Sequence, residues 1–233
     1  KEINKICKKF YSHLCDLIVE SIKLFSISNE QILKRFKVNN PEILQPYFDR
    51  GQSLIIVGGH YNNWEMLAAG IDQQVPHDTV GLYSKLSNAF FDDKMKSSRS
   101  AFGLRMVTSK DSFVYFKEKH DIPRMTIFGA DQSPTYSKSV YWTTFLNQET
   151  AVALGTERFA KKYDMPVIYA TINKEKRGHF SLDISILCES PQHTKEGEIT
   201  TLHTRKLEEQ ILAQPEYWLW THKRWKRKRK ENE

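Results

Sequence analysis

The sequence predicts an α/β fold: a mostly parallel central sheet with helices on both faces and an antiparallel edge. Short runs of apolar, β-forming residues alternate with helix-forming segments along most of the 233 residues. Such alternation is typical of parallel strands joined by helices. Hydrophobic residues make up 39% of the chain and charged residues 27%, a balance that excludes a disordered protein. We expect one domain over residues 1–233, since the length suits a single core and no internal repeat or low-complexity linker is present.

The first predicted element is an amphipathic helix over residues 2–25. Apolar residues recur every three or four positions from Ile3 to Phe25, which is the period of one helix face. This face should meet either a core or a membrane. The segment SISNEQ at 26–31 then offers capping residues for a second, shorter helix. The chain starts in helical register without an initiator Met, so we expect it to be a piece of a longer protein.

The next elements alternate between strand and helix. The predicted strands are SLIIVGG (53–59), TVGLYS (79–84), RMVTS (105–109), RMTIFGAD (124–131) and MPVIYATIN (165–173). The predicted helices are NWEMLAAG (63–70), NAFFDDKMKSSRSAFG (88–103), KDSFVYFKEKH (110–120) and, after a polar loop, AVALGTERFAKKYD (151–164). HFSLDISIL (179–187) alternates apolar with small or polar residues and should form a hairpin with the preceding strand, giving the antiparallel edge. A long helix (196–214) and a closing block (215–230) end the chain.

Charge and cysteine content narrow the class of protein. The net charge is +7, and the stretch KRWKRKRK at 223–230 carries seven positive charges followed by two glutamates, so only the C-terminus is strongly basic. The three cysteines, Cys7, Cys15 and Cys188, lack the spacing of a redox or zinc motif and suit a reduced, cytoplasmic setting. No apolar run approaches the roughly 20 residues that span a bilayer.

The most informative short stretch is GGHYNNWE at 58–65, where a histidine follows a buried strand. Sites in parallel α/β sheets gather beyond the carboxyl ends of the strands, and His60 falls at such an end. Glu65 lies five residues later, so the two side chains can meet if His60 is in the loop and Glu65 in the first turn of a helix that Asn62 or Asn63 caps. A carboxylate beside an imidazole suits a general base acting on an alcohol. A purely structural histidine remains the alternative, and a metal site is not expected because the second His of a zinc helix is missing.

Several further blocks, taken in order, resemble one enzyme family. HYNNWE fits the His-x4-acid box of glycerolipid acyltransferases, and VGLYSKLSNAFFDDKMKSSRSAFG, IFGADQ, WTTFLNQETAVALGTERFAKKYDMPVI and PEYWLWTHKRWKRK follow it. Together they resemble the late acyltransferases of lipid A biosynthesis, the lauroyl and myristoyl transferases. Lys85 stands where an Arg is usual in that family, and the Gln often found after PE is absent. The FPEG-type block of the glycerol-phosphate and lysophosphatidate branch is also missing.

The resemblance implies a reaction and roles for single residues. A fatty acyl chain would pass from a thioester to a hydroxyl of a glycolipid, expected to be a lipid A precursor, with His60 as the base and Glu65 orienting it. A hydrophobic anchor upstream of Lys1 would also be expected. No cofactor is implied: the acyl thioester, on acyl carrier protein or coenzyme A, is a co-substrate. Arg99 suits a phosphate of the headgroup or of the carrier, and Asp131 would pair with Arg99 or hold the site loop. Gln132 adjoins Asp131.

Lesser candidates complete the predicted site. Lys85 and Asn88 are expected to help bind the headgroup, and the helix that begins after Asn62 could supply donors to the oxyanion. As alternatives, Arg99 could be a solvated helix charge, and Asp131 a turn residue or helix cap.

The closing block predicts contact with a membrane or with an acidic carrier protein. Aromatic residues settle at the lipid–water boundary, and cations are drawn to anionic lipid. The residues expected to make this contact are Trp218, Trp220, Lys223, Arg224, Trp225, Lys226 and Arg227. A solvated charge run beside core aromatics is the plainer reading, and nucleic-acid binding is not expected because the charge is confined to one end.

We therefore expect a bacterial acyltransferase on the cytoplasmic face of the inner membrane. Within the same class, the alternative substrates are a lysophospholipid, an amino-acid lipid or a phosphatidylinositol mannoside. Outside it, the alternative is a basic lipid-binding module without activity.

Overall fold

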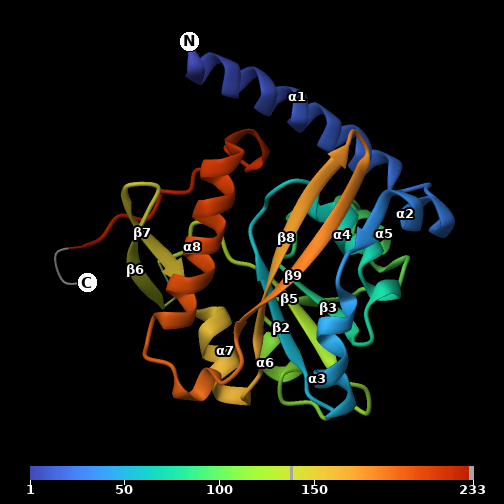
Figure 1. The fold of residues 1–233 in the computed structure, drawn as a ribbon, viewed down its shortest axis with the longest axis vertical. Coiled ribbons are helices and arrows are strands. Elements are labelled where there is room, and N and C mark those ends of the chain that lie inside the picture. Colours follow the sequence, from blue (N-terminus) through green and yellow to red (C-terminus); the bar gives the residue numbers. More distant parts are fainter. Residues whose placement is uncertain (137–138, 231–233) are drawn as a thin grey trace.

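The computed structural model describes residues 1–136 and 139–230, and a seven-stranded sheet organises them (Figure 1). The strand order is β1-β9-β8-β2-β5-β3-β4. The strands are β1 (Phe36–Val38), β2 (Leu54–Gly58), β3 (Asp78–Tyr83), β4 (Arg105–Thr108), β5 (Arg124–Gly129), β8 (Val167–Lys176) and β9 (His179–Cys188). Neighbours pair in parallel except β8 and β9, which form the predicted antiparallel hairpin. The predicted mostly parallel α/β fold with an antiparallel edge is thus confirmed.

Helices occupy both faces of this sheet. They are α1 (Glu2–Lys23), α2 (Asn29–Arg35), α3 (Gln45–Asp49), α4 (Trp64–Gly70), α5 (Ala89–Ser100), α6 (Ser112–Tyr115), α7 (Gly155–Tyr163) and α8 (Glu198–Ala213). Short 3-10 turns lie at Pro41–Leu44, Asp72–Gln74, Pro191–His193 and Pro215–Tyr217. The predicted capping at 26–31 is confirmed, because the Ser28 side chain accepts a hydrogen bond from the Gln31 amide at the start of α2.

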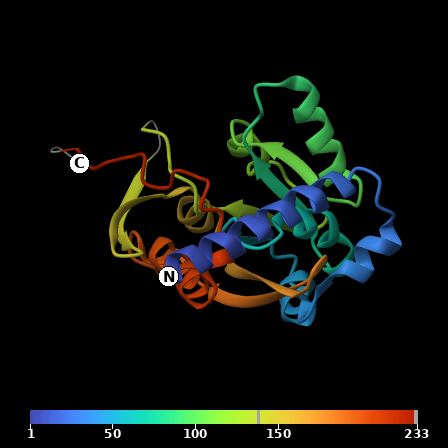
Figure 2. The same cartoon turned by 90° about the horizontal axis from the view of Figure 1, so that it is seen from above.

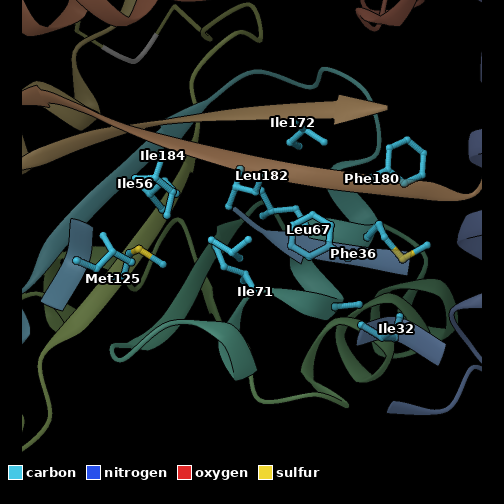
Figure 3. Packing of buried hydrophobic residues seen from close by; sticks show 14 of the residues in the cluster. Ile32, Phe36, Ile56, Leu67, Ile71, Met125, Ile172, Phe180, Leu182 and Ile184 are labelled. Atoms are coloured by element: carbon cyan, nitrogen blue, oxygen red, sulfur yellow. The ribbon is translucent and has the colours of Figure 1, made fainter. Parts of the chain in front are cut away.

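The core has two halves because β2 is buried on both sides. Leu54 and Ile56 face a cluster built with α2, α4, β1 and β9, while Ile55 and Val57 face a cluster built with α7, α8 and the C-terminal segment. Successive side chains of a strand point to opposite faces, so a run of four apolar residues serves both halves. Figure 3 shows the first cluster, in which Ile56 lies among side chains from the neighbouring strands and from α4.

Three parts of the chain differ from the sequence prediction. A hairpin of β6 (Val140–Phe145) and β7 (Gln148–Ala153) replaces the polar loop, and α7 begins at Gly155 rather than 151. The two-residue turn of this β6–β7 hairpin, Leu146 and Asn147, has positive φ at both positions, as tight hairpin turns require. The helix predicted over 110–120 shrinks to α6, and β1, which the sequence did not predict, extends the sheet beyond β9.

Helix α1 crosses the end of the molecule where β8 finishes, as Figure 1 and Figure 2 show. Asp16 anchors it there by ion pairs to Lys174 and Arg177 of the β8–β9 hairpin. The helix begins where the predicted helix begins and ends two residues earlier, and its predicted apolar face is divided. Phe10 and Leu17 are buried against the protein, whereas Ile3, Ile18 and Ile22 lie on an exposed apolar face. Within the described residues no helix combines the length and apolar character needed to cross a bilayer.

The two-sided burial of β2 gives a stability prediction. Replacing Ile56 by Ala should lower the free energy of unfolding by about 2–5 kcal/mol, since a fully buried side chain would leave a cavity in the first cluster. Leu212→Ala is the control, because that α8 side chain is exposed and its loss should change the free energy by under about 0.5 kcal/mol. Urea unfolding measures both, and equal effects of the two changes would contradict this assignment of the core.

Candidate active site

Two polar residues meet where β2 and β5 end. The two strands are parallel neighbours, and Gly58 lies opposite Gly129 in their register. His60 follows the first strand and Asp131 the second, each two residues beyond its glycine. The order of strands in the sheet therefore brings together two side chains that are 71 positions apart in the chain.

Asp131 fixes the imidazole of His60 by two hydrogen bonds. Its Oδ1 lies 2.6 Å from Nδ1 of the ring, and its Oδ2 accepts a bond of 2.9 Å from the backbone amide of the same histidine. A carboxylate is an acceptor, so the ring carries its proton on Nδ1 and leaves Nε2 unprotonated in the neutral form. That is the form a general base needs.

Trp218 completes the set of donors around Asp131. Its indole Nε1 donates to Oδ2 at 2.9 Å, and the tryptophan is 2% exposed. The segment around it also pairs with the loop that carries His60, because the backbone amide of Asn62 donates to the oxygen of Tyr217 and that of Leu219 donates to the oxygen of His60. The closing block therefore helps to hold both Asp131 and the His60 loop in position.

Glu65 does not contact His60 through a hydrogen bond, which corrects the predicted pairing. It lies in the first turn of α4, as expected, but its carboxylate accepts bonds of 2.8 and 2.5 Å from Nε and Nη2 of Arg99 on α5. The Trp64 indole, which lies edge-on to His60, donates to the same carboxylate at 3.1 Å. The expected pairing of Asp131 with Arg99 is wrong for the same reason: each acid of the site has the other's predicted partner.

These charges set the protonation of the pair. Burial lowers the pKa of His60, but the charge and hydrogen bond of Asp131, and then the charge of Glu65, raise the pKa more, so it lies above the ordinary 6.5. Burial alone would raise the pKa of Asp131, yet the contact with His60 and the bond from Trp218 hold it at about 2. Asp131 is thus a permanent anion at neutral pH, and a protonated His60 is stabilised beside it.

Two glycines make room for this contact. A Cβ on Gly129 would lie 2.9 Å from Cε1 of the His60 ring, and a Cβ on Gly59 would lie 2.7 Å from the side chain of Leu207 and 3.4 Å from Asp131. Side-chain carbons do not approach so closely without displacing a neighbour. The space beside Gly59 is therefore filled by the protein's own Leu207 side chain.

The other ring nitrogen of His60 faces an opening. The amide nitrogen of Gln132 lies 3.4 Å from Nε2. His60, Trp64 and Arg99 stand beside a cavity of about 120 Å³ whose remaining walls are mostly apolar. Those apolar walls come from β2, β3, β4, β5, β8 and α4, namely Ile56, Leu67, Leu82, Leu104, Met106, Ile127 and Ile172. A base, an ion pair and an apolar chamber thus adjoin one another.

The lesser candidates lie nearby but have local tasks. Asn63, not Asn62, caps α4 by accepting from the Met66 amide at 2.8 Å, which removes that amide as a donor to an oxyanion. Asn88 caps α5 through the Phe91 amide. Lys85 is exposed in the loop that leads from β3 to α5, at the same sheet edge as His60.

The predicted surface of the closing block is divided between inside and outside. Arg224 and Arg227 are buried and donate to backbone oxygens of Ala151 and Thr135. Trp225 is half-buried and donates to Thr150, and Trp218 belongs to the site. These four residues do not form the membrane-facing surface that composition predicted, because their side chains face the protein. Trp220, Lys223 and Lys226 remain exposed.

Sequence reasoning missed the partner of His60 and the role of Trp218. The DQ dipeptide after an apolar strand was the available signal for Asp131, but its partner depends on which strands are neighbours. Among the described residues no group of three or more His, Cys, Asp or Glu side chains could hold a metal ion.

A comparison with protein families gives a match over most of the chain. The model described as bacterial lipid A biosynthesis acyltransferase matches residues 1–227, which includes both strand ends and nearly all of the closing block. A comparison with individual curated proteins finds no match. The chain therefore belongs to the bacterial lipid A biosynthesis acyltransferase family, and it is an acyltransferase.

Proposed function

We propose that this enzyme transfers a fatty acyl chain from an acyl thioester to a hydroxyl of a glycolipid, a precursor of lipid A. One observation carries the proposal: buried Asp131 holds the proton of the His60 ring on Nδ1, while Nε2 faces an opening beside an apolar chamber. A base with this geometry can take a proton from an alcohol, and the apolar walls suit a hydrocarbon chain.

The proposed reaction needs no nucleophile from the enzyme. Nε2 of His60 takes the proton of the acceptor hydroxyl, and the oxygen attacks the thioester carbonyl to form a tetrahedral oxyanion. The intermediate then expels the thiolate, which receives the proton from His60, so an ester and a thiol leave. Asp131 stabilises the transient imidazolium. The amide of Gln132, next to Nε2, is the donor we assign to the oxyanion.

Arg99 and Lys85 are placed to bind the polar part of the substrates. Glu65 takes two of the five N–H donors of Arg99 and holds the guanidinium beside the chamber. The remaining donors, with the exposed ammonium of Lys85, would bind a phosphate of the acceptor headgroup or of the thioester carrier. In this assignment Glu65 positions Arg99 and adds negative charge near His60.

The exposed surfaces suggest where the enzyme works. We infer that α1 lies in the bilayer interface by its exposed apolar face, and that the exposed lysines of the closing block contact anionic lipid. The acceptor would then be reached on the cytoplasmic face of the inner membrane. The donor would be acyl carrier protein, whose acidic surface the basic end of the chain fits, or coenzyme A.

Replacing His60 should abolish acyl transfer, and the composition of lipid A in the cell should show which lipid is the acceptor. Cells that lack this protein should contain lipid A with one secondary acyl chain fewer by mass spectrometry, and the wild-type chain, but not His60→Ala, should restore it. Asp131→Asn should lower the purified enzyme's rate by roughly 10²–10⁴, since it removes the orienting acceptor. Unchanged lipid A with altered phospholipids would contradict the glycolipid assignment, and full activity of His60→Ala would contradict the base.

Changing the exposed lysines tests membrane binding. Each should add about 1 kcal/mol of attraction to anionic lipid, so their loss should weaken binding to phosphatidylglycerol vesicles by roughly 10- to 100-fold, less at high salt. The lysines to change to Gln are Lys223, Lys226 and Lys228. The matched control changes three exposed lysines elsewhere, Lys37, Lys117 and Lys119. Equal loss from both sets, measured by vesicle co-sedimentation, would contradict a specific contact of the closing block.

A further inference from the structure

A second, smaller cavity lies behind Asp131, on the side away from the apolar chamber. It measures about 10 Å³, which is room for about one water molecule. Its walls include Asp131, Tyr169 of β8, His203 of α8 and Arg224 of the closing block. Side chains from β8, from α8 and from the closing block thus share the walls of this cavity with the buried carboxylate.

Two polar atoms in these walls lack a partner among the described residues. They are Nε2 of His203 and Nε of Arg224, and both are buried. The Nη2 of Arg224 donates to the backbone oxygen of Ala151 in β7 at 2.7 Å. This hydrogen bond leaves Nε of the same guanidinium without an acceptor in the part of the chain that the structure describes. Buried polar groups without a hydrogen bond are costly, and one water between them would satisfy both.

The residues around this cavity differ in charge. Asp131 is a buried anion, and Arg224 is a buried cation 3% exposed. Burial lowers the pKa of Arg224 to about 10, against the opposing charge of Asp131, so the side chain stays charged at neutral pH. Burial, and then Arg224, lower the pKa of His203 to about 4, so this imidazole is neutral. Arg224 and Asp131 thus carry opposite charges in the walls of one small cavity behind the His60 ring.

We propose that Arg224 and His203 hold one water molecule behind Asp131, and that Arg224 is a positioning residue whose charge opposes that of Asp131 and so favours the neutral form of the His60 ring. Without this cation, Asp131 would stabilise the His60 imidazolium, which cannot accept a proton, still more strongly. This inference rests on the proposed function only in giving His60 the part of the base.

The other titratable and charged groups around His60 and Asp131 stay the same when the wild-type protein is compared with the Arg224 variants. Those that face His60 or Asp131 are Glu65 of α4, Arg99 of α5, Tyr169 of β8, His203 of α8, and His222 and Arg224 of the closing block. Changes confined to Arg224 leave all the others in place, so a shift of the His60 titration reports that charge.

The test is an NMR titration of the His60 ring in the whole chain, together with the pH dependence of kcat/KM. Arg224→Gln keeps a donor for the water but removes the charge, so the pKa of His60 and the acid limb of activity should both rise by roughly one unit. Arg224→Lys keeps the charge and should restore the wild-type titration. Asp131→Asn should move the pKa of His60 the opposite way.

A matched arginine separates charge from structure. Arg227→Gln removes another buried arginine of the same segment, one that does not line this cavity, and should leave the His60 titration unchanged. If Arg224→Gln does not fold, the double change Arg224→Gln/Asp131→Asn leaves neither charge unbalanced, and its His60 pKa should exceed that of Asp131→Asn alone. An unmoved or lowered His60 pKa in a folded Arg224→Gln or in the double variant would overturn the proposal.

The water has its own test, which needs no variant. A high-resolution crystal structure of the protein should show an ordered water within about 3.2 Å of both Nε2 of His203 and Nε of Arg224. A dry cavity would refute that half of the proposal. A titration that shifts as expected in a protein that transfers no acyl chain would instead leave the inference standing and refute the proposed function.

Discussion

The carboxylate of Asp131 is the point on which the site depends. It accepts hydrogen bonds from the backbone and ring of His60 and from the indole of Trp218. These donors come from the end of β2 and from the C-terminal segment, while the acid itself follows β5. An ionised carboxylate in a buried position is stable only with such partners. The cost of burying this charge therefore ties three distant parts of the chain to one geometry.

The register of the sheet sets that geometry, and hydrogen bonds from the closing block hold the His60 loop in place. Because β2 and β5 are parallel neighbours, His60 and Asp131 emerge at the same edge in register. The segment from Tyr217 to Leu219 then pairs with the loop that carries His60. A second ion pair, between Glu65 and Arg99, joins α4 to α5 beside the apolar chamber. The two acids thus have separate partners: Asp131 orients the His60 ring, and Glu65 holds the Arg99 guanidinium.

Much of this could be predicted from the sequence, and the failures have physical causes. Alternating strand and helix patterns give the parallel sheet, and a histidine after a buried strand gives the base. The partner of that histidine could not be predicted, because it depends on strand order, and the order here is not sequential: β2 lies beside β5 rather than β3. A spacing of five residues allowed Glu65 to approach His60 but could not show that Arg99 would take its carboxylate. In the closing block, composition alone could not tell Trp218 and Arg224, which face inward, from Lys223 and Lys226, which face out.

The position of the proton on the His60 ring tests the central claim most directly. ¹⁵N NMR of the histidine-labelled protein, at a pH above the pKa of His60 and assigned with the His60→Gln variant, reports which ring nitrogen is protonated. We expect a proton on Nδ1, held by Asp131, with Nε2 free to act as the base. A neutral ring protonated on Nε2 would contradict it, because Nδ1 would then face Asp131 without a proton to donate.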